Sequence, residues 1–301
     1  MVHRGVLSEC VINISEGRDH AVIAAVSAAG GDSVLDVHSD PEHHRSVLTL
    51  GGPLEVVEES ARQVVAAAVS LIDLRSHAGI HPRLGAVDVV PFVALPDPVH
   101  PPHVLRPDVL DARGRLAAWA GAELGLPCFL YGPERTLPDI RRLAFRSLRP
   151  DTGPNAPHVT AGATAVGARP VLVAYNLWIA GPPDRDPGDR QDHAWRVARS
   201  LAADLRGPAV RALGLPTEAG AQVSVNLIDP GSVPLPSLYD AVAGGAESRD
   251  CSVLRAELVG LLPARVLDQV PRHRWSQLDL SPDRTIEGRM QARGYPLAGG
   301  E

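Results

Sequence analysis

Imidazole and guanidinium groups are concentrated in one short stretch of the sequence, DLRSHAGIHPRLGAVDVVPFVAL, from Asp73 to Leu95. It holds Arg75, His77, His81 and Arg83, interspersed with glycine, proline and small residues. Pro82 fixes its own φ and biases the preceding residue towards extended conformations, which restricts where the imidazole of His81 can point. An imidazole titrates at a pH of about 6.5 and can both accept and return a proton. We therefore predict His81 as a general acid–base group, with His77 as the next candidate; a loop histidine without chemical role is the alternative.

A metal site is the second chemistry that the histidines suggest. Seven of the twelve histidines fall between His38 and His103, and two of them, His43 and His44, are adjacent. However, the His77–His81 pair sits among glycine and proline residues and lacks the glutamate of a helical HExxH site. We therefore predict no metal.

Carboxylates and guanidinium groups near these histidines are candidate partners. Asp36 and Asp40 follow an apolar strand pattern, and a carboxylate there would orient a catalytic imidazole; a turn residue at a strand end is the alternative. Arg45 and Arg83 would grip the carboxylate of a substrate bidentately. Buried structural ion pairs are the alternative for both arginines.

A run of small residues, Gly162 to Arg169 (GATAVGAR), is a candidate binding loop. We predict a flexible, turn-like segment whose backbone amides approach a flat or anionic ligand closely. Its glycine spacing matches neither a dinucleotide-binding fingerprint nor a phosphate-binding loop of nucleoside triphosphatases. A plain tight loop is the alternative.

Composition excludes several classes of function. The net charge of −6 opposes nucleic-acid binding, and the absence of any lysine excludes Schiff-base chemistry. No apolar run reaches the roughly 20 residues that span a bilayer, and no secretory signal is visible, so we expect a cytoplasmic protein without membrane contact. The three cysteines, widely spaced and odd in number, predict small buried hydrophobic residues rather than a disulfide framework.

Apolar periodicity predicts the elements that must position these residues. The first half has the order β-α-β-β-α-β, typical of a split βαβ unit, with strands at 10–14, 33–38, 46–50 and 87–93 and helices at 18–29 and 54–72. Further elements are expected at 113–124, 128–131 and 137–144. The second half repeats the theme with strands at 171–177, 221–228 and 253–259 and helices at 192–205, 236–244 and 263–269. We expect two domains, 1–176 and 177–301, a hinge at the proline-rich loop 181–188, an Ala/Gly turn before residue 221 and a frayed tail from residue 286.

The histidine stretch also resembles a known signature. His77 to Phe92, read as H-x-G-x-H-P-R-x-G-A-x-D-V-x-P-F, is similar to the motif of the formimidoyltransferase (glutamate formiminotransferase) family. The similarity continues in family order through further blocks at 9–18, 34–45, 127–132, 162–164, 221–229 and 258–263.

This resemblance implies a fold, a reaction and a set of residues. The fold is an α/β (α+β) one with two ferredoxin-like βαββαβ-type subdomains, whose mixed sheets have helices packed on one face. The reaction is the folate-dependent transfer of a formimidoyl group between N-formimidoyl-L-glutamate and tetrahydrofolate, in histidine degradation and one-carbon metabolism, by a homodimer. The implied catalytic residue is His81, for which Asp36 and Asp40 stay the candidate partners. The resemblance implies a folate site at Gly162, Ala163, Thr164 and Gly167; Arg45, Arg83 and His77 stay candidates for binding folate or substrate.

Three positions depart from the family pattern. His44 stands where asparagine is common, Ile80 where glutamate or valine is common, and Thr152 where an aromatic residue is usual. These changes leave open a folate-dependent enzyme with a different one-carbon donor. A folate- or metabolite-binding protein of the same fold without turnover is the other alternative, and the presence of both His81 and Arg83 disfavours it.

Overall fold

The computed structural model describes residues 6–79, 83–96 and 105–295. Contacts divide the chain into two compact units, residues 1–170 with 293–301, and residues 171–292. The predicted catalytic His81 and three further histidines, His3, His100 and His103, lie outside the described residues.

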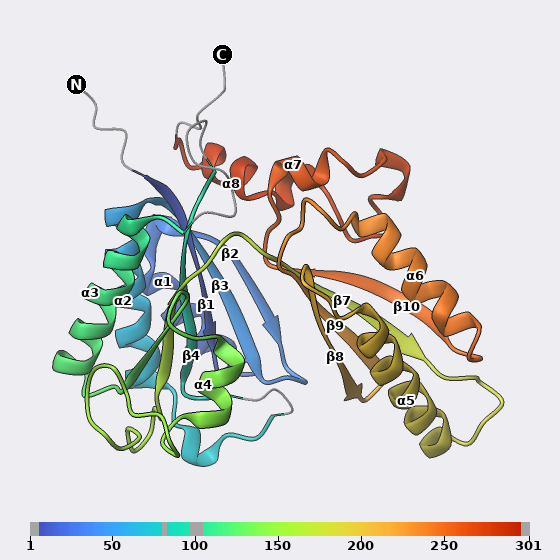
Figure 1. Cartoon of the computed structure of the whole chain (residues 1–301), viewed down its shortest axis with the longest axis horizontal. Coiled ribbons are helices and arrows are strands. Elements are labelled where there is room, and N and C mark those ends of the chain that lie inside the picture. The colour runs from blue at the N-terminus through green and yellow to red at the C-terminus, as the bar shows by residue number, and fades with distance from the viewer. Residues whose placement is uncertain (1–5, 80–82, 97–104, 296–301) are drawn as a thin grey trace. The chain divides into compact units, whose positions relative to one another are not determined.

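The first unit is built on a sheet of six strands (Figure 1). Its first six elements are β1 (Leu7–Ile14), α1 (His20–Ala29), β2 (Val34–Asp40), β3 (Arg45–Pro53), α2 (Leu54–Leu71) and β4 (Val87–Ala94). These four strands pair antiparallel in the order β2-β3-β1-β4. After α3 (Pro107–Glu123), the strands β5 (Cys128–Tyr131) and β6 (Thr164–Ala168) extend the sheet in parallel, and α4 (Leu137–Leu143) lies between them in sequence.

The second unit repeats the antiparallel arrangement. It consists of β7 (Val173–Ala180), α5 (Pro187–Leu205), β8 (Val210–Thr217), β9 (Gly220–Leu227), α6 (Leu235–Glu247) and β10 (Ser252–Val259), followed by α7 (Ala264–Leu267) and α8 (Ile286–Ala292). The strand order is β10-β7-β9-β8. In both units the fourth, first, third and second strands of a βαββαβ segment are neighbours in that order. The predicted pair of ferredoxin-like subdomains is confirmed.

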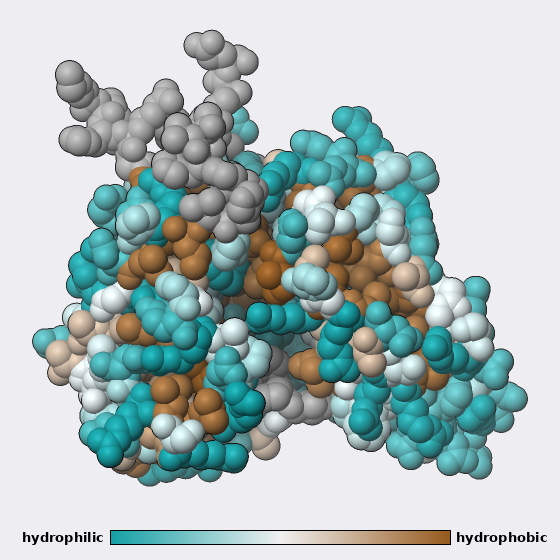
Figure 2. Space-filling view, viewed as in Figure 1, coloured by the Kyte–Doolittle hydropathy of each residue, from teal (hydrophilic) through white to brown (hydrophobic). Residues whose placement is uncertain are grey.

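Helix packing follows from the apolar patterns. On α2 the residues at helical spacing, Val57, Ala61, Val64, Val65 and Ala68, are all fully buried. They share one core with alternate residues of β1 and β3 and with α3, so these helices cover one face of the first sheet. At the end formed by β5 and β6, α4 packs on the opposite face through Ile140. On the face shown in Figure 2, hydrophilic residues are interspersed with several groups of apolar ones.

Three sequence expectations are wrong at the level of secondary structure. The expected loop at 162–169 is largely the strand β6, whose five residues are all buried. Its residues are small because the strand lies between two cores, and a Cβ at Gly167 would collide with the ring of Tyr131. The turn expected before residue 221 contains β8, an edge strand in which exposed side chains and Pro216 obscure the apolar alternation. The tail expected to fray contains α8, which buries Ile286 and Met290.

Helix α3 begins at Pro107, earlier than its apolar spacing indicated. All three cysteines are free and buried, as predicted. Among the described residues, no helix is long and apolar enough to cross a membrane.

Candidate active site

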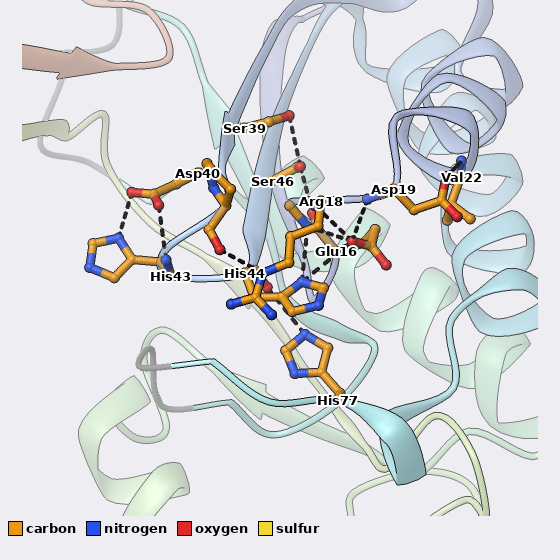
Figure 3. Close-up of polar contacts among 12 residues, drawn as sticks. Glu16, Arg18, Asp19, Val22, Ser39, Asp40, His43, His44, Ser46 and His77 are labelled. Carbon is orange, nitrogen blue, oxygen red and sulfur yellow. Dashed lines mark hydrogen bonds and ion pairs between the residues drawn. The ribbon is translucent and has the colours of Figure 1, made fainter. Parts of the chain in front are cut away.

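The turn between β2 and β3 is held together by Asp40. One oxygen of its carboxylate, Oδ1, accepts hydrogen bonds from the backbone N–H groups of Glu42 and His43, each at 2.9 Å. The other oxygen, Oδ2, lies 2.7 Å from Nδ1 of His43, and both side chains are buried (Figure 3). An aspartate that bonds to backbone two and three residues ahead is typical of a tight turn. The described contacts of Asp40 therefore lie within its own turn.

These hydrogen bonds determine the ionisation of Asp40. Burial by itself raises the pKa of this carboxyl group, but the hydrogen bonds and charge of His43 and the N–H of Glu42 outweigh it and lower the pKa to about 2. Asp40 is therefore a carboxylate at neutral pH and acts as an acceptor only.

His44 lies next to this turn and is fixed by the loop after β1. Its backbone is in the left-handed region, with φ of 51°, and Nδ1 accepts the N–H of Gly17 at 3.2 Å. Glu16 Oε1 is 3.4 Å from the same nitrogen but already accepts three backbone N–H groups. Burial lowers the pKa of His44, opposed by Glu16 and reinforced by Arg18 and Arg83. Both observations assign a neutral imidazole with its proton on Nε2.

His77 and Arg83, which flank His81 in sequence, meet the same turn. The ring of His77 packs on that of His44 with centroids 3.9 Å apart, and its Nε2 lies 3.2 Å from the carbonyl oxygen of His44. Since a carbonyl only accepts, Nε2 carries the proton, and Nδ1 accepts from the guanidinium of Arg83. The two residues at either side of the catalytic candidate are therefore joined to each other and to the β2–β3 turn.

Gly79 makes this contact possible. A Cβ at this position would stand 2.7 Å from the carbonyl oxygen of His43 and 2.8 Å from both Arg83 Nη2 and His44 Cβ. A side chain there would force the segment away from the turn. The glycine two residues before His81 is thus explained by close approach of two backbone segments.

The second half of the motif is anchored by Asp88. This buried carboxylate accepts the backbone N–H of Leu84 at 2.6 Å and a bidentate pair from Arg141, at 3.2 and 2.5 Å. The adjoining residue Gly85 forms a bridge to Gly162, and Ala163 N–H donates to the carbonyl of Leu84. The histidine motif and the glycine run, separated by about 80 residues in the sequence, are therefore direct neighbours.

The remaining predicted residues are distributed over two sheet faces. Asp36, Asp40 and Arg45 lie on the face of β2 and β3 opposite the helices, because Leu48 and Leu50 fill the helix side and side chains alternate. Arg45 is the direct cross-strand partner of Asp40. By the same alternation, the side chain of Thr164 points to the helix side with Val166, where it is fully buried.

His158 and Thr152 both have structural contacts. His158 Nδ1 accepts the N–H of Ala161 at 3.0 Å and so closes the turn before Gly162, whose φ is 68°. Thr152, at the position where an aromatic residue is usual, donates its hydroxyl to the carbonyl of Ala117 at 2.6 Å.

Sequence reasoning missed the pairing of Asp40 with His43 and the part played by Glu16 and Gly17. The first had a local signal, an aspartate three residues before a histidine across a proline. The second had no local signal, because the β1–α1 loop is more than 20 residues from the turn in the sequence and meets it only in the fold: Arg18 Nε donates to the carbonyl of Pro41 at 2.8 Å, and Ser46, on β3, donates to the carbonyl of Glu16 at 2.6 Å.

Comparison with known proteins adds to this geometry. The family described as "Formiminotransferase domain, N-terminal subdomain" matches residues 7–169, and "Formiminotransferase domain" matches residues 191–282. The chain belongs to the formiminotransferase family. A glutamate formimidoyltransferase of Streptococcus pyogenes serotype M1 is 33% identical over 291 residues, covering 88% of this chain and 92% of that protein.

Two further relatives of this formiminotransferase-family chain come from distant organisms. A glutamate formimidoyltransferase of Thermoplasma acidophilum is 31% identical, covering 89% of the chain and 91% of the relative. The formimidoyltransferase-cyclodeaminase of Gallus gallus is 35% identical over 87% of the chain, but the match spans only 51% of that longer protein.

Proposed function

We propose that this chain transfers a formimidoyl group from N-formimidoyl-L-glutamate to tetrahydrofolate. The observation that carries the proposal is the similarity to glutamate formimidoyltransferases along nearly their whole length, at 92% and 91% of the two relatives. The arrangement around the motif supports it, because His77 and Gly79 of the family signature contact the β2–β3 turn and Arg83 is bonded to His77.

The reaction requires two proton transfers. A secondary amine of the pteridine attacks the formimidoyl carbon and loses a proton while the new C–N bond forms. The C–N bond to the nitrogen of glutamate then breaks, and this nitrogen gains a proton. We assign both transfers to His81, which acts first as base and then as acid.

The neighbouring residues then have supporting roles. Arg83, bonded to His77, and Arg45, on the face of β3 opposite the helices, would bind carboxylates of the glutamate donor or of the folate tail. Asp36 and Asp40 are the proposed partners that orient His81; the described contacts of Asp40 already include His43. Gly162 and Gly167 pair with Gly85 and Pro91 of the motif, and Gly162, Ala163, Thr164 and Gly167 are proposed as part of the folate site, Thr164 through its backbone because its side chain is buried.

Activity assays with a histidine variant test the proposal. We expect wild-type protein to release glutamate from N-formimidoyl-L-glutamate only when tetrahydrofolate is present. kcat/KM should decrease at acid pH with an apparent pKa of about 6.5, shifted upwards by a carboxylate partner. His81→Ala should lower kcat by about 10² to 10⁴ and remove this acid limb. His20→Ala, a histidine exposed on α1, is the matched control.

Other outcomes would redirect the assignment. Turnover of His81→Ala within a few-fold of wild type, with the acid limb intact, would remove His81 from the mechanism and leave His77 as the next candidate. His44 stands where asparagine is common in the family, and it contacts Gly17, Glu16 and His77 beside the motif. A different one-carbon donor is therefore the second candidate, and an assay with N-formyl-L-glutamate in parallel tests it. A homodimer in the cytoplasm remains a prediction of the family resemblance, and light scattering tests the dimer.

A further inference from the structure

One ring nitrogen of His44 lies between a hydrogen-bond donor and an acceptor. Its Nδ1 accepts the backbone N–H of Gly17 at 3.2 Å and lies 3.4 Å from Glu16 Oε1, as the dashed lines in Figure 3 show. The same N–H of Gly17 also donates to Glu16 Oε1, at 2.9 Å. An imidazole nitrogen accepts a hydrogen bond only while it carries no proton, and donates one when it does. The contact between His44 and Gly17 therefore belongs to the neutral imidazole.

Gly17 is held in place by the backbone of β2 and β3. It is buried, and a Cβ at this position would stand 2.5 Å from the backbone nitrogen of Arg45 and would also collide with the carbonyl oxygen of Asp40. The neighbouring carbonyl of Glu16 accepts from the hydroxyl of Ser46 at 2.6 Å. If Nδ1 of His44 gained a proton, two N–H donors would face each other across 3.2 Å. Because the loop is fixed, the ring of His44 is the part that has to move.

The ring of His44 is also a contact of the histidine motif. It lies against the ring of His77, with centroids 3.9 Å apart, and His77 in turn accepts from Arg83. The charged and titratable side chains that face His44 are Glu16 and Arg18 of the β1–α1 loop and His77 and Arg83 of the segment after α2. Of these, Arg18 and Arg83 disfavour an imidazolium, and Glu16 favours it. A moved or charged ring of His44 would therefore disturb His77 and repel Arg83.

We propose that His44 is a positioning residue, which holds His77 and Arg83 in place while its imidazole is neutral and releases them when Nδ1 is protonated. This inference rests on the proposed function, in which Arg83 binds a substrate carboxylate next to His81. Protonation would exchange the contact with Gly17 for an ion pair with Glu16, whose Oε1 is 3.4 Å from the same nitrogen. The transferase would then have a second acid-sensitive group besides its catalytic base.

The surroundings of His44 determine the pH at which this release occurs. Burial lowers the pKa of His44 from its ordinary value of about 6.5; Glu16 opposes this effect, and Arg18 and Arg83 reinforce it. His44 is therefore neutral at pH 7, and its neutral contacts are lost only as the pH decreases through the lowered pKa. Below the pKa values of both His81 and His44, two protonations each inactivate the enzyme. kcat/KM of the wild type should there decrease about 100-fold per pH unit, instead of about tenfold for a single group.

Replacement of His44 by asparagine tests the inference through the slope of the pH profile. Asparagine tolerates the left-handed backbone at this position, φ 51°, and its amide oxygen can accept from Gly17 but does not titrate. In His44→Asn, kcat/KM should decrease only about tenfold per pH unit in the same acid range. Glu16→Gln keeps an oxygen for the backbone N–H groups but removes the charge that favours the imidazolium, so its steep decrease should begin at lower pH. His20→Ala, exposed on α1, should keep the wild-type slope. Equal slopes in wild type and His44→Asn would overturn the inference.

Nuclear magnetic resonance tests the same inference without turnover. On acidification of the wild type, the ring of His44, the ring of His77 and the amide of Gly17 should change with one midpoint below about pH 6.5. In Glu16→Gln this midpoint should move to lower pH, and in His44→Asn the change at Gly17 should be absent. Protonation of His44 without a change at Gly17 and His77, or a ring that stays neutral until the protein unfolds, would overturn the inference and leave the proposed function intact. A common midpoint in a protein without transferase activity would support the positioning role and remove the proposed function.

Discussion

At the scale of single residues, the carboxylate of Asp40 stabilises the turn between β2 and β3 through its hydrogen bonds. The sequence suggested a carboxylate that orients His81, and the structure gives Asp40 an imidazole three residues away, His43. With three hydrogen bonds to one carboxylate, the turn that contacts the catalytic motif depends on Asp40 remaining ionised. This dependence can be measured as stability.

Asp40→Asn should destabilise the protein by about 2 kcal/mol at pH 7, since the pKa of Asp40 is about 2 in the folded protein and about 3.9 when unfolded. A depressed pKa contributes stability above the unfolded value. The difference between wild type and variant should therefore shrink as the pH decreases from about 4 to about 2. Urea titrations at several pH values measure it, with Asp111→Asn on the surface of α3 as control. A pH-independent difference would contradict this account.

At the scale of elements, the critical feature is the contact between the β2–β3 turn and the segment after α2. The segment from His77 to Gly79 lies against this turn through one pair of tilted rings in contact, one hydrogen bond to a carbonyl and the absence of a side chain at Gly79. None of these contacts involves an apolar core. The position of the motif is therefore sensitive to a single added methyl group.

Gly79→Ala should lower kcat/KM by at least tenfold, because a Cβ would stand within 2.8 Å of the carbonyl of His43 and of Arg83 Nη2. The free energy of unfolding should decrease by about 1–3 kcal/mol, the usual cost of overpacking. Gly114→Ala is the matched control: Gly114 lies in α3, where an added Cβ meets nothing within 4 Å, and the change should stabilise the helix by about 0.4–1 kcal/mol. Full activity of Gly79→Ala would show that the segment need not be so close to the turn.

At the scale of the whole molecule, two units with the same strand order have separate hydrophobic cores. Leu116 belongs to the core of the first unit and Leu201 to that of the second. Of the four tryptophans, Trp178, Trp195 and Trp275 are in the second unit and Trp119 is in the first. Tryptophan fluorescence therefore reports mainly on the second unit.

Leu201→Ala should move the fluorescence-detected urea transition to lower concentration by about 1–2 M, which corresponds to a loss of about 2–5 kcal/mol for a cavity in the second core. Leu116→Ala makes the same substitution in the first core. It should instead shift part of the urea transition detected by circular dichroism to lower concentration and leave the fluorescence-detected transition nearly unchanged. Identical shifts of a single transition by both variants would mean that the units unfold as one.

The sequence by itself determined the order of the main helices and strands, because each has a local apolar pattern: helical spacing in α2 and a continuous buried run in β4. It also predicted the two ferredoxin-like subdomains, and its motif predicted the family. Only the tertiary structure decided that the glycine run is a strand. Its residues are small because Tyr131 packs against Gly167 and hydrophobic cores lie on both sides of the strand. The partner of Asp40 also required it, because hydrogen bonding depends on neighbours that sequence spacing does not specify.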